Sequence, residues 1–167
     1  PAASDRSAVV VATIALTRFG CFSAVLVALH FGRPDYTPVD HMISDYAVGR
    51  AGWLMTTAFV ALGSGCLSLS IGLWRSGPKT LAALIARLLL IVVFFGLMVT
   101  ATFATDLETA KDTQHGMIHT FRFLVNIVSI SFAAFLLSLS FGGDPRWKTS
   151  RPPSLRFALA RVRAFVV

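Results

Sequence analysis

The sequence predicts an all-α integral membrane protein, a bundle of four transmembrane helices. Of its 167 residues, 55% are hydrophobic and only 14% are charged, whereas soluble domains carry about 25% charged residues. Four long apolar runs occupy residues 1–143, and most charges lie between or beyond them. A chain of this composition cannot cover itself with polar surface, so a water-soluble domain is excluded.

The four predicted spans cover about residues 8–31, 51–74, 80–104 and 116–142. Each reaches the length of about 20 apolar residues that a helix needs to cross a bilayer. The second span is rich in small residues, which let neighbouring membrane helices approach closely. Cys21 and Cys66 both lie inside apolar runs, so they are interpreted as packing residues rather than as a disulfide.

The C-terminal segment, residues 144–167, is rich in Lys and Arg, and its last part is also apolar. Arg156 and Arg163 lie seven residues apart and share one face if the segment is helical. Residues 155–167 alone are too short to span, so they predict a basic interfacial amphipathic helix within a cytoplasmic tail. The other interpretation is the start of a fifth span.

Charges between the spans predict the orientation. The N-terminus, the second loop and the tail hold nine of the fifteen Lys and Arg residues, and the first and third loops hold six of the eight acids. The positive-inside rule then places both termini in the cytoplasm. We expect a multi-pass protein of the bacterial cytoplasmic (inner) membrane. The net charge of +7 fits membrane lipids as partners rather than nucleic acid.

The loop between the first two spans contains the first candidate site. His41, Ser44 and Asp45 lie at i, i+3 and i+4, which places them on one face of a helix. The alternative interpretation is structural, with Ser44 or Asp45 capping the second helix and His41 solvated.

The loop between the third and fourth spans leads into the second candidate site. His115 and His119 are one helical turn apart, and Arg122 and Asn126 continue the same face. Two histidines at this spacing are found in zinc sites, although the Glu of the H-E-x-x-H motif is missing here. The alternative interpretation is structural. These polar residues would then face water at the end of the helix bundle and form hydrogen bonds with carboxylates of the loops.

The predicted topology brings both loops to the same side of the membrane. His41, His115 and His119 are therefore candidate zinc ligands, with Asp45 or Asp106 as a fourth ligand or its anchor, and Ser44 as a donor to substrate or water. Zinc with an open position would lower the pKa of its water and create a hydrolytic nucleophile. Ser44, Asp45 and Asp106 are the candidate catalytic residues.

Arg18 lies near the middle of the first span. An ionised residue at that depth costs at least about 2.5 to 3.5 kcal/mol unless it is paired or reaches the surface. We expect a polar contact with another span, a lipid or a partner protein.

Three separated motifs carry a resemblance to a known family: the run from His41 to Met55, the segment Phe103 to Asp106, and the segment His115 to His119. Together they resemble the bacterial membrane-protein family catalogued as domain of unknown function 998. The resemblance implies a polytopic fold, usually with about six spans, and no activity. A remoter analogy is to alkaline ceramidases, zinc membrane hydrolases in which Ser44, His41, His115, His119 and Asp106 or Asp45 would have counterparts.

Two functions follow as expectations. The first is a non-catalytic accessory or scaffold subunit that interacts with lipid or with other membrane-protein subunits. The second is a zinc-dependent intramembrane hydrolase that acts on a lipid from the extracytoplasmic side. Transport and haem binding are supported only by Arg18 and scattered histidines.

Overall fold

Four long helices make up the fold. A computed structural model describes residues 3–37, 41–103, 105–107 and 113–147. The helices are α1 (Ala3–Gly32), α2 (Gly52–Ser76), α3 (Leu81–Thr102) and α4 (Gln114–Ser140), with 3-10 turns η1 (Asp45–Ala47) and η2 (Phe141–Gly143). All four are long and apolar enough to cross a membrane. The prediction of an all-α transmembrane protein is confirmed.

The helices begin where side chains or backbone geometry satisfy their free N–H groups. The hydroxyls of Thr80 and Thr113 accept hydrogen bonds from the third backbone N–H that follows, each at 3.1 Å, and so cap α3 and α4. α2 begins differently, after Ala51 in the left-handed conformation with φ 63°. A Cβ at position 52 would collide with the carbonyl of Ala47, so this tight turn requires glycine there.

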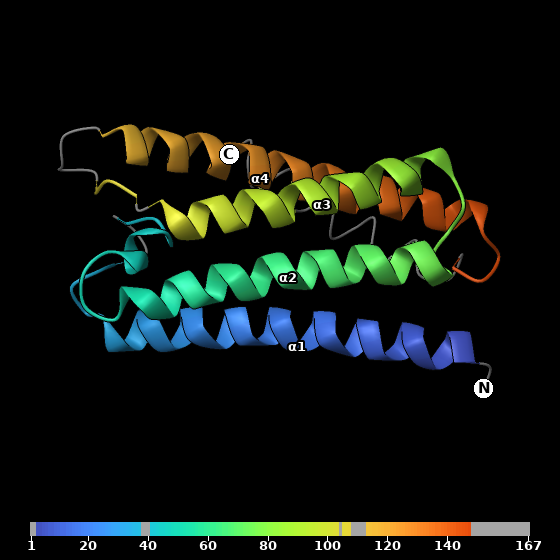
Figure 1. The fold of residues 1–167 in the computed structure, drawn as a ribbon, viewed down its shortest axis with the longest axis horizontal. Coiled ribbons are helices and arrows are strands. Elements are labelled where there is room, and N and C mark those ends of the chain that lie inside the picture. The colour runs from blue at the N-terminus through green and yellow to red at the C-terminus, as the bar shows by residue number, and fades with distance from the viewer. Residues whose placement is uncertain (1–2, 38–40, 104, 108–112, 148–167) are drawn as a thin grey trace.

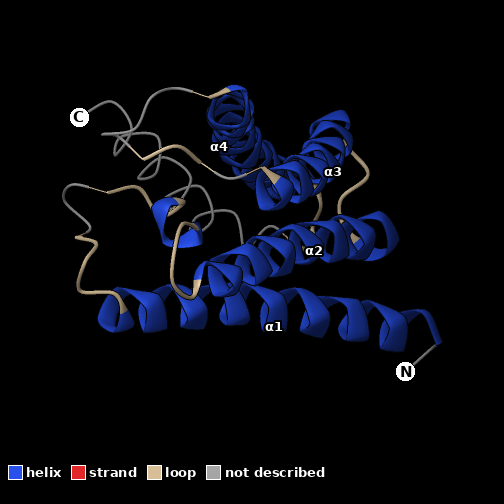
Figure 2. Ribbon diagram, turned by 60° about the vertical axis from the view of Figure 1, so that its left-hand side comes forward, coloured by secondary structure: helices blue, strands red, loops and turns tan. Residues whose placement is uncertain are grey.

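The helices pack in chain order, α1 on α2, α2 on α3 and α3 on α4 (Figure 1). α1 and α4 make at most a marginal contact with each other, so they are the two edges of an open array. Figure 2 shows α1 and α2 on one side of the molecule and α3 and α4 on the other. The first and third loops lie at one end of the array, and the N-terminus and the second loop at the other.

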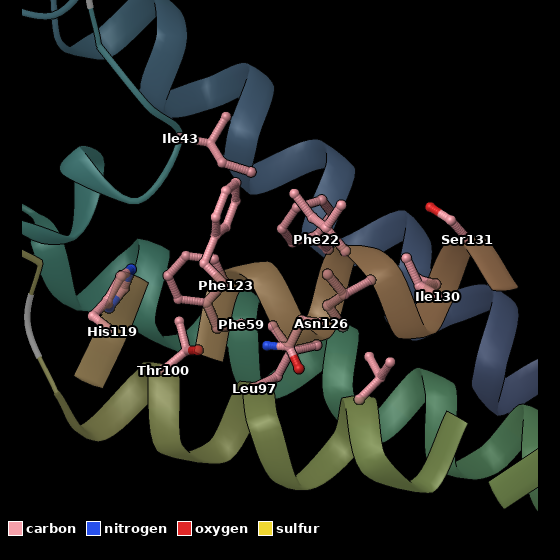
Figure 3. Close-up of a pocket in the computed structure, with 13 residues that line it drawn as sticks. Phe22, Ile43, Phe59, Leu97, Thr100, His119, Phe123, Asn126, Ile130 and Ser131 are labelled. Carbon is pink, nitrogen blue, oxygen red and sulfur yellow. The ribbon is translucent and has the colours of Figure 1, made fainter. Parts of the chain in front are cut away.

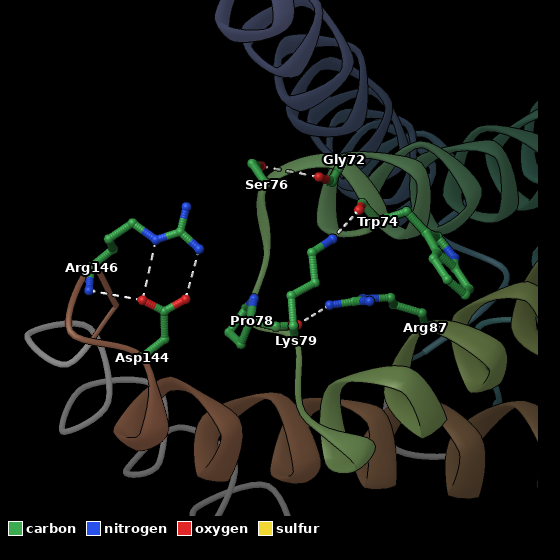
Figure 4. A network of polar contacts seen from close by, with 8 residues as sticks. All are labelled: Gly72, Trp74, Ser76, Pro78, Lys79, Arg87, Asp144 and Arg146. Carbon is green, nitrogen blue, oxygen red and sulfur yellow. Dashed lines mark hydrogen bonds and ion pairs between the residues drawn. The ribbon is translucent and has the colours of Figure 1, made fainter.

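At the end of the array that carries the second loop, basic side chains donate hydrogen bonds to backbone carbonyls (Figure 4). The buried guanidinium of Arg87 donates to the carbonyl of Pro78 and lies 5.2 Å from the ring centroid of Trp74. Lys79 donates to the Trp74 carbonyl at 2.6 Å. These contacts fix the turn between α2 and α3.

The observed helices differ from the predicted spans mainly at one end. α1 begins at Ala3 rather than at residue 8, because polar residues continue its first turns beyond the apolar run. The predicted interfacial helix or fifth span falls within residues 148–167, outside the described residues, so both interpretations of the tail stay predictions.

Candidate functional site

His119 is the buried member of the predicted histidine pair. It lies in the second turn of α4 with 2% of its surface exposed. Its Nδ1 lies 2.8 Å from the carbonyl oxygen of Phe103. A carbonyl can only accept, so Nδ1 carries a proton and donates. Nε2, the other ring nitrogen, is buried and has no hydrogen-bond partner among the described residues.

Asn126 lies two turns further along the same face of α4 and is also buried, with 7% of its surface exposed. Its Oδ1 is buried and accepts no hydrogen bond from the described part of the chain. The amide packs against Gly96 of α3, where an added Cβ would collide with Oδ1. The close approach of α3 and α4 at this level therefore depends on a glycine facing an asparagine.

His119 and Asn126 line one cavity of about 350 Å³ (Figure 3). Its walls are apolar and come from all four helices, for example Phe22 of α1, Phe59 of α2 and Leu97 of α3. Ser131 of α4 adds a third buried polar atom without a partner, its Oγ. None of its lining residues in the described part of the chain is Asp, Glu, Lys or Arg. The cavity is thus mainly apolar, and three of its lining residues each carry one buried polar atom that has no hydrogen-bond partner among the described residues.

The other two predicted histidine ligands lie elsewhere. His41 packs edge-on against Tyr36 with ring centroids 4.7 Å apart, and the exposed His115 packs against Phe103 at 5.2 Å. Across the described part of the chain, no three His, Cys, Asp or Glu residues form a group that could hold a metal ion. The structure therefore does not bring His41, His115 and His119 together as a ligand set. Zinc binding itself stays a prediction, which metal analysis of the purified protein would test.

Ser44 and Asp45 are buried in the loop between α1 and α2, with 3% and 1% of their surfaces exposed. The Asp45 carboxylate accepts from the backbone N–H of Met42 at 2.8 Å, so it stabilises the turn that leads into η1. The interpretation that either residue caps the second helix is wrong, because the residue before α2 is Ala51. The catalytic role of Ser44 and Asp45 stays a prediction.

Asp106 holds the start of α4. Its two carboxylate oxygens accept from the backbone N–H and the hydroxyl of Thr113, at 2.6 and 2.9 Å. A Cβ on Gly116 would collide with the same carboxylate. Asp106 thus has a structural task in this fold, beside which its catalytic role stays a prediction.

Arg33, which the sequence analysis did not single out, organises the loop between α1 and α2. Its guanidinium binds both carboxylate oxygens of Asp35 at 2.7 to 3.0 Å, donates to the carbonyl of Val48 and lies over the ring of Tyr36. Hydrogen bonding to Arg33 lowers the pKa of Asp35, and the same pair raises the pKa of Arg33. The sequence feature that could have revealed this pair is an Arg and an Asp two residues apart, on either side of Pro34.

Arg18 and Arg122 both lie outside the cavity. Arg18 is exposed on α1 and makes no hydrogen bond or ion pair within the described chain. Its Cβ packs near Gly65 of α2. Arg122 is half-buried, and its guanidinium lies 6.0 Å from the ring of Phe121. Of Arg18, Arg122 and Asn126, Asn126 alone lines the cavity.

The fold and this cavity define a polytopic α-helical membrane protein with an apolar internal site. The chain belongs to the family described as Protein of unknown function (DUF998), whose model matches residues 19–167. The predicted family is confirmed, and its description states no activity. No curated protein and no solved structure shows a significant match, so the analogy to alkaline ceramidases has no support from these comparisons.

Proposed function

We propose that this protein is a non-catalytic membrane subunit that pairs through α1 with a transmembrane helix of another protein. The observation that carries the proposal is Arg18, which is exposed at the middle of the most open helix. Lipid surrounds this face in an isolated chain, and lipid tails offer no partner for a guanidinium.

Arg18 lies too deep to reach either surface easily. At about 1.5 Å per residue it lies about 18 Å from Arg6 and about 21 Å from Gly32 along the helix. An uncompensated arginine at that depth costs at least about 2.5 to 3.5 kcal/mol. A partner carboxylate at the same depth would recover much of this free energy.

The chain itself has no acid to offer at that depth. None of its four candidate spans, 6–32, 52–76, 81–102 and 114–143, contains an Asp or Glu. A second copy packed on the same face would bring one Arg18 close to the other, which is repulsive. The chemistry of the partner is therefore a transmembrane helix that carries an Asp or Glu near its centre.

The outer face of α1 is suited to such packing. Only 6% of its most apolar stretch is buried, against 44% in α2. An exposed apolar helix surface of this kind is free to pack against a second membrane helix.

The proposed setting is the bacterial inner membrane, with both termini in the cytoplasm. The support is the charge pattern: the acidic first and third loops share one end of the array, and the second loop lies at the other with Arg75 and Lys79. A cysteine introduced at Ser76 should then react with a membrane-impermeant thiol reagent only after the cells are opened.

Extraction in mild detergent tests the subunit role. The wild-type chain should purify with a companion membrane protein whose span contains an acid, and Arg18→Leu should lose that companion while the chain remains folded. Arg122→Leu is the matched control, because it removes an arginine from another span, and it should keep the companion. A wild-type chain that purifies as a stable monomer would refute the proposal.

A further inference from the structure

We propose that a groove between the end of α1 and the start of α2 binds the phosphate group of an anionic phospholipid, and that Arg50 is the residue that contacts it. The site lies at the end of the array that carries the first and third loops. It is separate from Arg18 in the middle of α1 and goes beyond the subunit role. Three features support it: the mixed lining of the groove, the unpartnered side chain of Arg50, and the turn that holds Arg50.

The groove joins an apolar part and a charged part. Its volume is about 630 Å³, which falls within the range for ligand sites, about 300 to 1,000 Å³. The apolar lining lies within the two helices and includes Ala28, Leu29 and Leu54. The charged lining lies beyond the helix ends and consists of Arg33, Asp35 and Arg50. A phospholipid has the same division, whereas a free phosphate ion would leave the apolar residues uncovered.

The groove lies where the apolar helices meet the loop. α1 ends at Gly32 and α2 begins at Gly52. Trp53, next to the start of α2, has 67% of its surface exposed, and tryptophan is enriched at the level of the lipid headgroups. A phospholipid of the surrounding bilayer therefore has its phosphate at the level of Arg50 and its chains along the helices.

Arg50 supplies the positive charge that is available to a ligand. Its side chain is exposed and makes no hydrogen bond or ion pair with the described part of the chain. The other two charges compensate each other, because Arg33 binds both carboxylate oxygens of Asp35. A guanidinium can bind two oxygens of a phosphate group at once. A choline headgroup fits less well, because its ammonium group would find the Asp35 carboxylate already bound to Arg33.

The loop holds the backbone of Arg50 in place. The residues on either side of it, Gly49 and Ala51, both have positive φ, 74° and 63°. A residue other than glycine rarely adopts such a value, which persists where surrounding contacts impose it. Those contacts come from Arg33, whose Nη1 donates to the carbonyls of Val48 and Arg50. The buried Arg33 thus fixes the turn from which the Arg50 side chain extends.

Photolabelling of the full chain in phosphatidylcholine nanodiscs tests the site. The probes are phosphatidylglycerol and phosphatidylcholine, each with the same diazirine-bearing acyl chain. Phosphatidylglycerol should label peptides from the end of α1 and the start of α2 more strongly than phosphatidylcholine does. Arg50→Gln should lower this labelling about fivefold, the effect of one basic residue near a lipid surface. The fold should persist, because the Arg50 side chain has no partner in the described chain to lose.

Two variants and a competitor separate this groove from general attraction of charge. Arg75→Gln removes an exposed arginine at the opposite end of the array and should leave the labelling of these peptides unchanged. Gly32→Phe fills the groove while Arg50 keeps its charge, since a Cβ at Gly32 meets nothing within 4 Å, and it should lower labelling as Arg50→Gln does. Inorganic phosphate in the buffer should not compete.

Three results would overturn the proposal. Equal labelling by the two lipids would show that the headgroup is not recognised. Labelling that survives Arg50→Gln or Gly32→Phe would show that the lipid binds elsewhere. Competition by inorganic phosphate would show that the site takes the free ion rather than a lipid.

Discussion

The two edge helices, α1 and α4, treat their polar residues in opposite ways. α4 buries His119, Asn126 and Ser129 against the array and turns residues such as Phe121 and Val128 outward. Within the described array, α1 packs mainly on α2 and leaves Arg18 exposed. Both helices are apolar enough to span, so composition does not separate them. A polar residue on the helix face that packs against the array can find a partner within the chain. A polar residue on the outward face needs a partner from another molecule.

The loops attached to these helices differ in a parallel way. The loop that leaves α1 is held by a pair of opposite charges, Arg33 and Asp35. The loop that enters α4 is held by Asp106, whose partners on Thr113 are uncharged. The first arrangement depends on both ionised groups, whereas the second depends on one carboxylate and the local turn.

The largest expected effect lies on α1. Replacement of Arg18 by Leu should favour membrane insertion of the first span by about 3 kcal/mol, because a central arginine is costly and leucine is favourable. A glycosylation-based insertion assay on the isolated span measures this. Thr17→Leu, one residue away, should change insertion much less. Equal gains for both variants would mean that the Arg18 side chain already reaches the surface.

Glycine substitutions sharpen the contrast between open and closed helix faces. Gly96→Ala should destabilise the protein by about 1 to 3 kcal/mol, the usual cost of overpacking, since the new Cβ collides with Asn126. Gly20→Ala adds the same methyl group on α1, where nothing lies within 4 Å. Unfolding of both variants in mild detergent measures the difference. A Gly96→Ala variant as stable as Gly20→Ala would contradict the α3–α4 contact.

Asp106→Ala tests the start of α4. Loss of its bonds to Thr113 should destabilise this helix end by about 1 kcal/mol, as for a lost helix cap. Hydrogen exchange at the backbone amides of Thr113 and Gly116 should become faster, while exchange at the start of α3 stays the same. Unchanged exchange at both amides would show that Thr113 caps α4 without help.

The smallest effect concerns the pH response of the loop between α1 and α2. The pKa of Asp35 is lowered by Arg33, so the stabilisation is complete above the pKa of an unfolded Asp, about 3.9, and is lost as pH falls through the lower folded value. Tryptophan fluorescence of Trp53, at the end of this loop, should report that loosening in acid. Asp35→Asn should remove the acid transition, and a transition that persists in that variant would have another origin.

The sequence was sufficient to locate the helices, but it was insufficient to predict which residues pack against each helix face. Apolar runs located all four spans, because membrane burial requires long apolar stretches. Helical spacing placed His115, His119 and Asn126 on one face, yet only the latter two are buried. His115 lies in the first turn of α4 and remains exposed. Periodicity identifies a face, whereas its neighbours come from the packing.

The cavity itself was the part that sequence could not supply. Its walls come from all four helices and from Ile43 of the first loop, and no local pattern encodes the meeting of such distant residues. The predicted gathering of His41 with the other histidines failed for the same reason, since the path of the first loop places His41 against Tyr36. Gly96 of α3 and Asn126 of α4 are visible in the sequence, but only the structure shows that they are in contact.

The uncovered arginine of α1 also has an electrical consequence. A charge halfway through the bilayer lies inside the transmembrane field, and moving one elementary charge across half of it changes the free energy by about 1 kcal/mol per 100 mV. In an unpaired chain, the depth and tilt of α1 would therefore respond to the membrane potential. A partner carboxylate would neutralise that charge, so the depth and tilt of α1 in the assembled complex would no longer respond to the membrane potential.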